Sequence, residues 1–235
     1  MKDNGQSAWS SIVPDIVEWD VPNWSVALEY WQEHSRLDLS SVYALEIDSR
    51  HGGLSLWLAL CGARVVCTDI GGPSEIAIDQ HAAYQVVGRI DYARLDALQI
   101  PHVEAFDVVL FKSVLGGIGR GKRKERQQRA VAEMYRALKP GGELWFAENL
   151  VASPFHQCLR RKWVQWGTQW RYVTLEETAD FLGPFAEAKY TTVGFLGALG
   201  RGTQQRMVLG HLDRLGFDRL VPEHWRYIAV GVARK

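Results

Sequence analysis

Hydrophobic and polar positions alternate in blocks along the middle of the chain, from about residue 41 to about residue 150. Short apolar runs lie at residues 42–47, 64–69, 88–92, 106–111 and 142–148. Stretches with apolar residues at helical spacing separate them, and this alternation predicts a parallel sheet with helices on its faces. Two later runs, at 186–195 and 225–233, predict an antiparallel pair that completes the sheet.

The first 40 residues are rich in tryptophan and predict a helical lid. Pro22-Asn23 begins a predicted helix that carries Trp24, Leu28 and Trp31 on one face. These aromatic groups, together with Trp9 and Trp19, either pack against the edge of the sheet or close over a ligand. Residues 41–235 form the main part of a single predicted domain.

A second irregular region, from about residue 150 to about residue 183, interrupts the pattern after the fifth strand. Its segment Pro154–Tyr172 is aromatic and basic and is too irregular to continue the sheet. Thr174 and Glu177 then have the spacing of a capped helix start. We therefore expect a helical insertion on this side of the sheet.

The segment Ala44 to Ile70 has the order of a nucleotide-type cofactor pocket. An apolar run ends at Glu46, a polar turn with glycines follows, and Leu54 to Ala63 continues at helical period. Glycines in such a turn let the main chain approach a ligand closely. Asp69, at the end of the next strand, is placed to accept hydrogen bonds from two ribose hydroxyls.

This segment resembles the first motif of the class I S-adenosylmethionine-dependent methyltransferases, which runs acid, any, Gly, any, Gly, any, Gly. The matching residues are Glu46-Ile47-Asp48-Ser49-Arg50-His51-Gly52. Asp48 and Arg50 replace two of the three glycines, so the turn needs either a different backbone path or tolerance of side chains near the methionine moiety. The Asp48 carboxylate would either hydrogen-bond the amino group of the cofactor or crowd it.

Three further segments fit the same resemblance. Asp96-Ala97 resembles the contact to the adenine, the strand 106–111 delivers Lys112 and Ser113 to the same edge, and Leu138 to Gly142 resembles the turn before the fifth strand. The resemblance implies an α/β fold with a doubly wound, seven-stranded, mostly parallel sheet and an antiparallel last strand. It also implies S-adenosyl-L-methionine as the cofactor, bound by Glu46, Asp48, Ser49, Arg50, Gly52, Asp69, Ile70, Asp96, Ala97, Lys112 and Ser113.

Composition narrows the possible partners. Lys plus Arg and Asp plus Glu number 27 each, so the overall charge does not favour nucleic acid. The basic run 120–129 is interpreted as the solvated face of a helix. Three cysteines without metal-type spacing indicate free thiols in a reducing compartment and no metal site. No stretch approaches a membrane span, and the start lacks a secretory signal, so we expect a cytoplasmic protein.

Methyl transfer to a hydroxyl acceptor requires a group that removes a proton. His156 follows the fifth strand in the insertion and is the first candidate for this base, with a surface or substrate-positioning role as the alternative. Glu148, at the carboxyl end of the fifth strand, is the second candidate. A salt bridge to Arg160 or Arg161 would explain Glu148 equally well.

The insertion also suggests the acceptor. Indole faces and cationic donors together suit a sugar ring or a phosphate-bearing molecule, and the residues concerned are Arg160, Arg161, Lys162, Trp163, Trp166, Trp170 and Arg171. The segment is also similar to methyltransferases of bacterial glycan biosynthesis. We expect O-methylation of a sugar, a glycan or another polar small molecule.

Two alternatives stay open. The departures at Asp48 and Arg50 also fit a catalytically silent methyltransferase-like module that binds a partner. The order of strand, turn, helix and acid is shared with nicotinamide-dependent oxidoreductases. Their third glycine and second half-sheet have no counterpart in this sequence.

Overall fold

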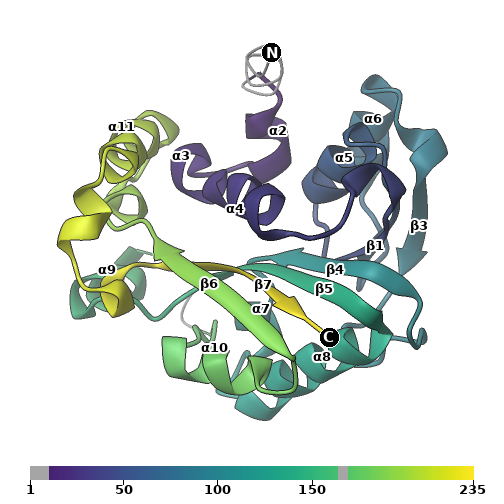
Figure 1. Cartoon of the computed structure of the whole chain (residues 1–235). Helices are drawn as coiled ribbons and strands as arrows, with labels where there is room; N and C mark the ends of the chain where they lie inside the picture. The colour runs from purple at the N-terminus through teal and green to yellow at the C-terminus, as the bar shows by residue number, and fades with distance from the viewer. Residues whose placement is uncertain (1–10, 164–168) are drawn as a thin grey trace.

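A seven-stranded sheet forms the centre of the structure (Figure 1), with the strand order β3-β2-β1-β4-β5-β7-β6. The computed structural model describes residues 11–163 and 169–235. The strands are β1 (Tyr43–Ile47), β2 (Arg64–Asp69), β3 (Ile90–Arg94), β4 (Phe106–Lys112), β5 (Leu138–Asn149), β6 (Glu187–Val193) and β7 (Ile228–Arg234). Strands β1 to β5 pair in parallel, and β7 is antiparallel to both β5 and β6. The predicted fold class is confirmed.

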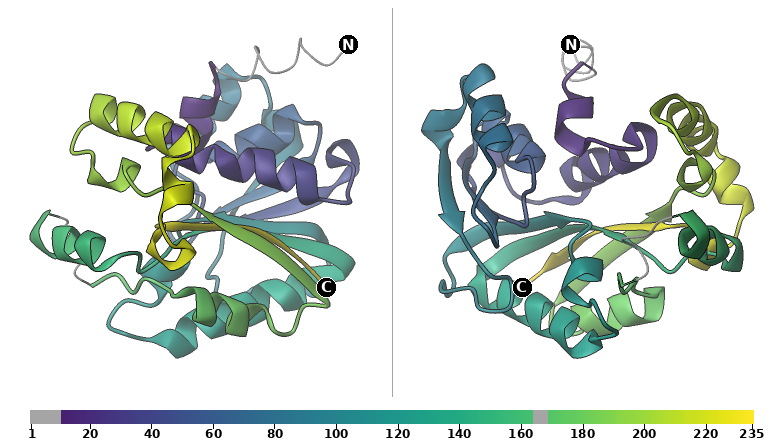
Figure 2. Two further views of the ribbon diagram at one scale, coloured as in Figure 1. Left: turned by 60° about the vertical axis from the view of Figure 1, so that its left-hand side comes forward. Right: turned by 180° about the vertical axis from the view of Figure 1, so that it is seen from behind.

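Helices cover both faces of this sheet (Figure 2). One face carries α2 (Val13–Val17), α3 (Val21–Trp24), α4 (Val26–His34), α5 (Gly53–Leu60) and α6 (Glu75–Ala83). The other carries α7 (Leu115–Ile118), α8 (Lys124–Ala137) and α10 (Leu175–Leu182). At one end of the sheet, α11 (Thr203–Arg214) packs against α3, and α9 (Pro154–Trp163) lies near the same end.

The central strands are apolar along their whole length because both of their faces are buried. In β4, Val108 and Leu110 belong to the core cluster under α2–α5, whereas Val109 and Phe111 belong to the cluster under α8. All four side chains are fully buried or nearly so. This two-sided burial explains why the sequence shows continuous apolar runs instead of alternation at these strands.

Two tryptophans of the N-terminal region, Trp24 and Trp31, belong to the core. Trp24 and Trp31 are buried, and the indole of Trp31 lies 5.9 Å from that of Trp57 and 6.0 Å from that of Trp145. The Trp31 Nε1 also donates to the Gly231 carbonyl at 3.1 Å. Helices α3 and α4 therefore pack on the sheet through these groups. Trp9 lies outside the described residues.

The insertion after β5 contains α9 and α10, joined to the sheet by a bridge between Leu150 and Val173. Helix α10 begins with the predicted cap, because the Glu177 N–H donates to Thr174 Oγ1 and the Thr174 N–H donates to the Glu177 carboxylate. Trp166 lies outside the described residues. Within the described ranges, no helix is both long enough and apolar enough to cross a membrane.

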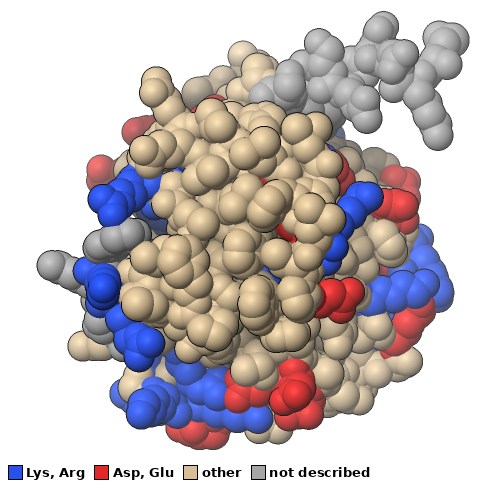
Figure 3. Space-filling model, turned by 90° about the vertical axis from the view of Figure 1, so that its left-hand side faces the viewer, with Lys and Arg blue, Asp and Glu red and all other residues tan. Residues whose placement is uncertain are grey.

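The surface over α11 is mostly uncharged, and Lys and Arg gather along its margin (Figure 3). Large apolar side chains are exposed in this region, among them Val208, Leu212, Leu215 and Leu220.

Candidate functional site

The predicted site residues lie where the central strands end. Glu46 lies near the end of β1, and Asp69 and Lys112 are the last residues of β2 and β4. The strand order reverses between β1 and β4, and ligands of open α/β sheets bind in the crevice at such a point. The topology therefore brings these three residues to one edge of the sheet.

Two adjoining cavities open at this edge. The first cavity, of about 570 Å³, is lined by twelve described residues: the predicted Glu46, Asp48, Ser49, Arg50, Asp69, Lys112 and Ser113, together with Glu18, Trp19, Asn149, Trp170 and Arg206. The second cavity, of about 310 Å³, is lined by Ile70, Asp96 and Ala97 among others. Asp48 and Trp170 line both cavities. A groove of about 630 Å³ between α4 and α11 contains none of the predicted residues.

The turn after β1 keeps a glycine-like backbone path without the glycines. Asp48, Arg50 and Gly52 have φ angles of 56°, 53° and 73°, all in the left-handed region. This region costs an L-residue about 1 to 2 kcal/mol. Asp48 and Arg50 therefore adopt the φ range that glycine favours, and how their side chains lie toward a bound methionine moiety stays a prediction.

Gly52 has a different task from the other residues of the turn. Its carbonyl accepts a hydrogen bond from His81 Nε2 at 2.8 Å, and a Cβ at this position would lie 2.6 Å from the imidazole ring. Gly52 lines neither cavity. It fixes the start of α5 against α6, so it shapes the turn without facing the cavities.

Carboxylates surround the first cavity. Glu46 accepts hydrogen bonds from the Ser55 N–H at 2.9 Å and from the Ser55 hydroxyl, and burial raises its pKa to about 7. Burial, and secondly the negative charge of Asp69, raise the pKa of Asp48 to about 6. Asp69 itself accepts from the N–H groups of Arg50 and Gly71 at 3.3 and 3.1 Å. The same lining also holds the cations Arg50, Lys112 and Arg206. Glu46, Asp48 and Asp69 nevertheless form no ion pair with a described residue and can accept from a cationic ligand.

The segment that connects α2 and α3 covers the first cavity. The Lys112 ammonium donates to the Val17 carbonyl at 2.9 Å and lies 3.3 Å from the centre of the Trp19 ring. Burial lowers the pKa of Lys112 to about 7. Glu18 forms ion pairs with Arg50 at 3.4 Å and with His51 at 3.1 Å. Among the described tryptophans of the N-terminal region, Trp19 is therefore the one that lines the cavity.

Several cavity residues were not predicted. Asn149, at the end of β5, donates from Nδ2 to Ser113 Oγ at 2.6 Å. Its place beside Glu148 at a strand end is a signal that the sequence does contain. Arg206 comes from α11, and no local pattern connects that helix with the turn after β1. Glu18 likewise reaches the cavity only through the packing of the N-terminal segment.

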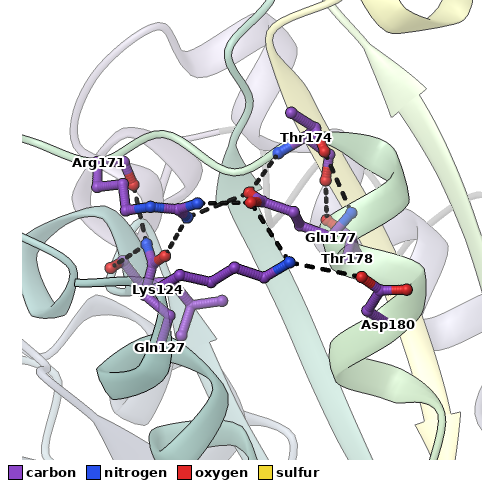
Figure 4. Close-up of polar contacts among 8 residues, drawn as sticks. Lys124, Gln127, Arg171, Thr174, Glu177, Thr178 and Asp180 are labelled. Atoms are coloured by element: carbon purple, nitrogen blue, oxygen red, sulfur yellow. Dashed lines mark hydrogen bonds and ion pairs between the residues drawn. The ribbon is translucent and has the colours of Figure 1, made fainter. Parts of the chain in front are cut away.

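Trp170 is fixed against α7 by close packing. A Cβ at Gly116 would lie 1.5 Å from Trp170 Nε1, so only glycine leaves room for the indole. The backbone beside it is held by the hydrogen bond from the Arg171 N–H to the Gly116 carbonyl at 3.0 Å. The Arg171 side chain extends to Gln127 and Glu177, beside Lys124 (Figure 4). Helices α7, α8 and α10 therefore together hold the segment around Trp170, which lines both cavities.

His156 is not presented to either cavity. Its side chain is 2% exposed, and its Nε2 lies 2.8 Å from the Phe195 carbonyl, which can only accept a hydrogen bond. Nε2 therefore carries the proton, and Nδ1 accepts from the Ser153 hydroxyl at 2.6 Å. Burial lowers the pKa of this imidazole. With both nitrogens engaged, His156 packs the insertion against the loop after β6, and we do not retain it as the base.

Glu148 is also engaged by the protein. Its Oε2 accepts from the N–H groups of Val114 and Leu115 at 2.8 and 2.7 Å, and Oε1 accepts from the Asn149 N–H at 2.9 Å. Burial raises its pKa to about 7. The carboxylate thus holds the start of α7, and the described residues give it neither a cavity-lining position nor the ion pair to Arg160 or Arg161 that the sequence suggested.

Comparison with known proteins agrees with this geometry. Residues 45–146 match the protein family described as "Methyltransferase domain". A comparison with curated protein sequences gave no match. Phosphoethanolamine N-methyltransferase 2 from Haemonchus contortus, solved with phosphomonomethylethanolamine and S-adenosylhomocysteine, has a TM-score of 0.66 and 16% identity, over 100% of this chain and 57% of that chain.

Two bacterial structures are similar over most of both chains. A possible histamine N-methyltransferase from Thermotoga maritima has a TM-score of 0.60 and 16% identity, covering 99% of this chain and 95% of that one. A putative methyltransferase from Bacillus halodurans has a TM-score of 0.60 and 17% identity, covering 90% and 99%.

The sheet order, the antiparallel strand β7 and these similar structures define a class I methyltransferase fold. The matched residues 45–146 include the turn after β1, Asp69 and Asp96. Residues 45–146 thus match a methyltransferase domain, and a similar structure from Haemonchus contortus was solved in complex with S-adenosyl-L-methionine.

The residues around the two cavities fit this cofactor. The first cavity has the carboxylates that a sulfonium and an ammonium group require, with Asp69 at the end of β2. The second cavity is lined mainly by aliphatic side chains, among them Ile70, Leu95 and Ile118, which suit the faces of an adenine ring.

Proposed function

We propose that the two cavities together bind S-adenosylmethionine and that the chain methylates a hydroxyl group of a sugar, a glycan or another polar small molecule. The proposal rests on one observation: both cavities lie at the carboxyl ends of the strands, at the same edge of the sheet, and Asp48 lines both of them. The methionine part would occupy the first cavity and the adenine the second, with Asp69 between them at the ribose. The binding role of each of these side chains is part of the proposal.

The polar groups of the first cavity support a hydroxyl-bearing acceptor. The bound cofactor supplies an electrophilic methyl group, so the protein has mainly to hold the acceptor in line and exclude water. Ser113 and Asn149 offer a hydroxyl and an amide at the end of β4 and β5, and Trp19 and Trp170 offer flat apolar faces. A sugar presents both an apolar face and hydroxyl groups to such a lining.

The first experiment is isothermal titration calorimetry with S-adenosylhomocysteine, followed by transfer of labelled methyl groups from S-adenosylmethionine to candidate sugars. One-site binding followed by labelling of a hydroxylated acceptor is the expected result. Binding without labelling of any acceptor would favour the silent module. Absence of cofactor binding would contradict the proposal as a whole.

A further inference from the structure

A third cavity, of about 460 Å³, shares Trp170 with the first two and differs from them in charge. We call it the basic cavity, and its side chains include Lys122, Arg160, Arg161, Arg171, Trp170 and Tyr172. The described residues that line it include no Asp or Glu. The first cavity, in contrast, has four carboxylates, from Glu18, Glu46, Asp48 and Asp69. The first cavity also has three cations, Arg50, Lys112 and Arg206, so its lining is mixed in charge, whereas the charged groups of the basic cavity are all cations. The basic cavity therefore favours an anionic group.

One of the four cations in the basic cavity is neutralised by the protein. Arg171 forms an ion pair with Glu177 and hydrogen bonds with Gln127 (Figure 4). The other three form no ion pair with a described residue. The sequence from Asn149 to Leu175 contains no Asp or Glu at all. The segment that carries two of these cations, from the end of β5 to the start of α10, thus has no carboxylate of its own that would pair with them.

Arg160 is the best-positioned of these three cations. Its Nη1 donates to the carbonyls of Leu150 and Val151 at 2.7 and 3.2 Å, and its guanidinium lies 3.9 Å from the centre of the Tyr172 ring. These contacts fix the planar group and use one of its nitrogens, which leaves Nε and Nη2 for a further acceptor. Burial lowers the pKa of Arg160, as expected for a charge held away from water without a counter-ion. Such a fixed guanidinium matches the planar, two-oxygen edge of an oxyanion.

We propose that the basic cavity binds an oxyanion, a phosphate or a carboxylate, that belongs to the methyl acceptor. The inference rests on the proposed function, because it names the chemical class of the acceptor in that reaction. Trp170 and Tyr172 provide ring faces beside the anion site, so the acceptor is a phosphorylated or acidic sugar. Its anionic group lies in the basic cavity, and its hydroxyl group extends past Trp170 to the first cavity.

The test measures binding of three related sugars by calorimetry, in the presence of saturating S-adenosylhomocysteine. Glucose 6-phosphate carries a phosphate, glucuronate carries a carboxylate, and glucose carries no charge. At least one of the two anionic sugars is expected to bind, and glucose to bind at least tenfold more weakly. The stronger of the two anionic sugars identifies the kind of oxyanion that the cavity prefers.

Matched variants test whether the anionic sugar binds in the basic cavity. The double variant Lys122→Gln/Arg161→Gln removes two exposed cations of the cavity, and Gln157→Glu places a carboxylate in its lining. Each is expected to weaken binding of the anionic sugar at least tenfold. The control is Arg129→Gln/Arg219→Gln, which removes two exposed cations outside the lining and is expected to change affinity less than twofold. Thermal unfolding of each variant checks that it is folded.

Two outcomes would overturn the inference. In one, neither anionic sugar binds better than glucose, although S-adenosylhomocysteine binds normally. In the other, the control lowers affinity as much as the cavity variants do, so that only general surface charge is involved. Both outcomes leave the cofactor site intact, whereas failure of S-adenosylhomocysteine to bind would contradict the proposed function itself.

Discussion

At the scale of single residues, Asp69 is the side chain whose removal tests the ribose assignment most directly. It ends β2 and lines the first cavity. We expect Asp69→Ala to weaken S-adenosylhomocysteine binding by about 1 to 3 kcal/mol, the scale for loss of charge-assisted hydrogen bonds. Calorimetry measures the change, and an unaltered dissociation constant would remove Asp69 from the site.

Asp48 gives the cofactor site a predicted dependence on pH. Burial and the charge of Asp69 raise its pKa to about 6, and a cationic ligand favours the ionised form. Affinity for S-adenosylmethionine is therefore expected to fall by roughly three- to tenfold between pH 7 and pH 5.

Asp48→Asn is expected to flatten this profile, because its amide does not titrate. S-adenosylhomocysteine, which lacks the sulfonium charge, serves as the control ligand and is expected to show a smaller change with pH. An equal slope in wild type and variant would assign the titration to another group.

At the scale of elements, the contact between α7 and the segment after α9 depends on a glycine. Gly116→Ala would place a Cβ 1.5 Å from Trp170 Nε1, so the indole must move. We expect a loss of about 1 to 3 kcal/mol in the free energy of unfolding, as for other overpacked sites, together with weaker cofactor binding. Urea denaturation and calorimetry measure the two effects.

Gly88→Ala is the matched control, because nothing lies within 4 Å of the added Cβ at that position. Its free energy of unfolding is expected to stay within about 0.5 kcal/mol of wild type. Equal losses in the two variants would show that the effect comes from replacing glycine and not from the contact with Trp170.

Elements with local patterns could be predicted from the sequence, and contacts between distant elements could not. The apolar runs identify all seven strands of the sheet, because a strand that is buried on one or both faces has apolar side chains close together in the sequence. The run Leu138–Gly142, expected to be a turn, is the start of β5, with Gly141 at a φ of 75°. The pairing of β4 with β5 shifts in register between Phe106–Leu138 and Val108–Glu143, so the predicted turn is an irregularity within the strand, beside an ion pair of 2.8 Å between Lys139 and Asp107.

The surroundings of the candidate base could not be predicted for the same reason. The position of His156 after β5 is local information, but its partner Phe195 is 39 residues away. Arg206 reaches the first cavity from α11 only because that helix packs on α3. The residues of the turn after β1 could be predicted because one short motif contains them. The surroundings of His156 and the position of Arg206 depend instead on the tertiary arrangement.

At the scale of the whole molecule, one buried polar network joins the N-terminal helices, β7 and α11. Tyr227 donates to Asp20, and Asn23 donates to Asp20, Asp213 and Tyr227. Asp213 also accepts from the N–H groups of Phe195, Leu196 and Gly197. The cover of the first cavity is therefore tied to the far end of the sheet.

This network predicts how stability depends on pH. Burial raises the pKa of Asp20 from 3.8 to about 8, so the folded state holds a proton that the unfolded state releases between these values. The contribution of Asp20 to stability is complete below pH 3.8 and is lost as pH rises through 8. Asp20→Asn retains an acceptor for Tyr227 and cannot ionise.

The variant is therefore expected to gain roughly 1 to 4 kcal/mol relative to wild type between pH 5 and pH 8. Urea denaturation at both pH values measures this difference, and the comparison cancels titration of groups that the two proteins share. A difference that does not change with pH would show that Asp20 is ionised throughout.

The position of Trp170 has a thermodynamic consequence. One indole bounds the first, second and basic cavities, so a ligand that displaces or immobilises it in one cavity alters the free energy of filling the others. Linkage of this kind is reciprocal: the factor by which the cofactor changes the dissociation constant of the acceptor equals the factor by which the acceptor changes that of the cofactor. The order in which the two ligands arrive then changes the rates of binding, while the stability of the ternary complex is the same by either route.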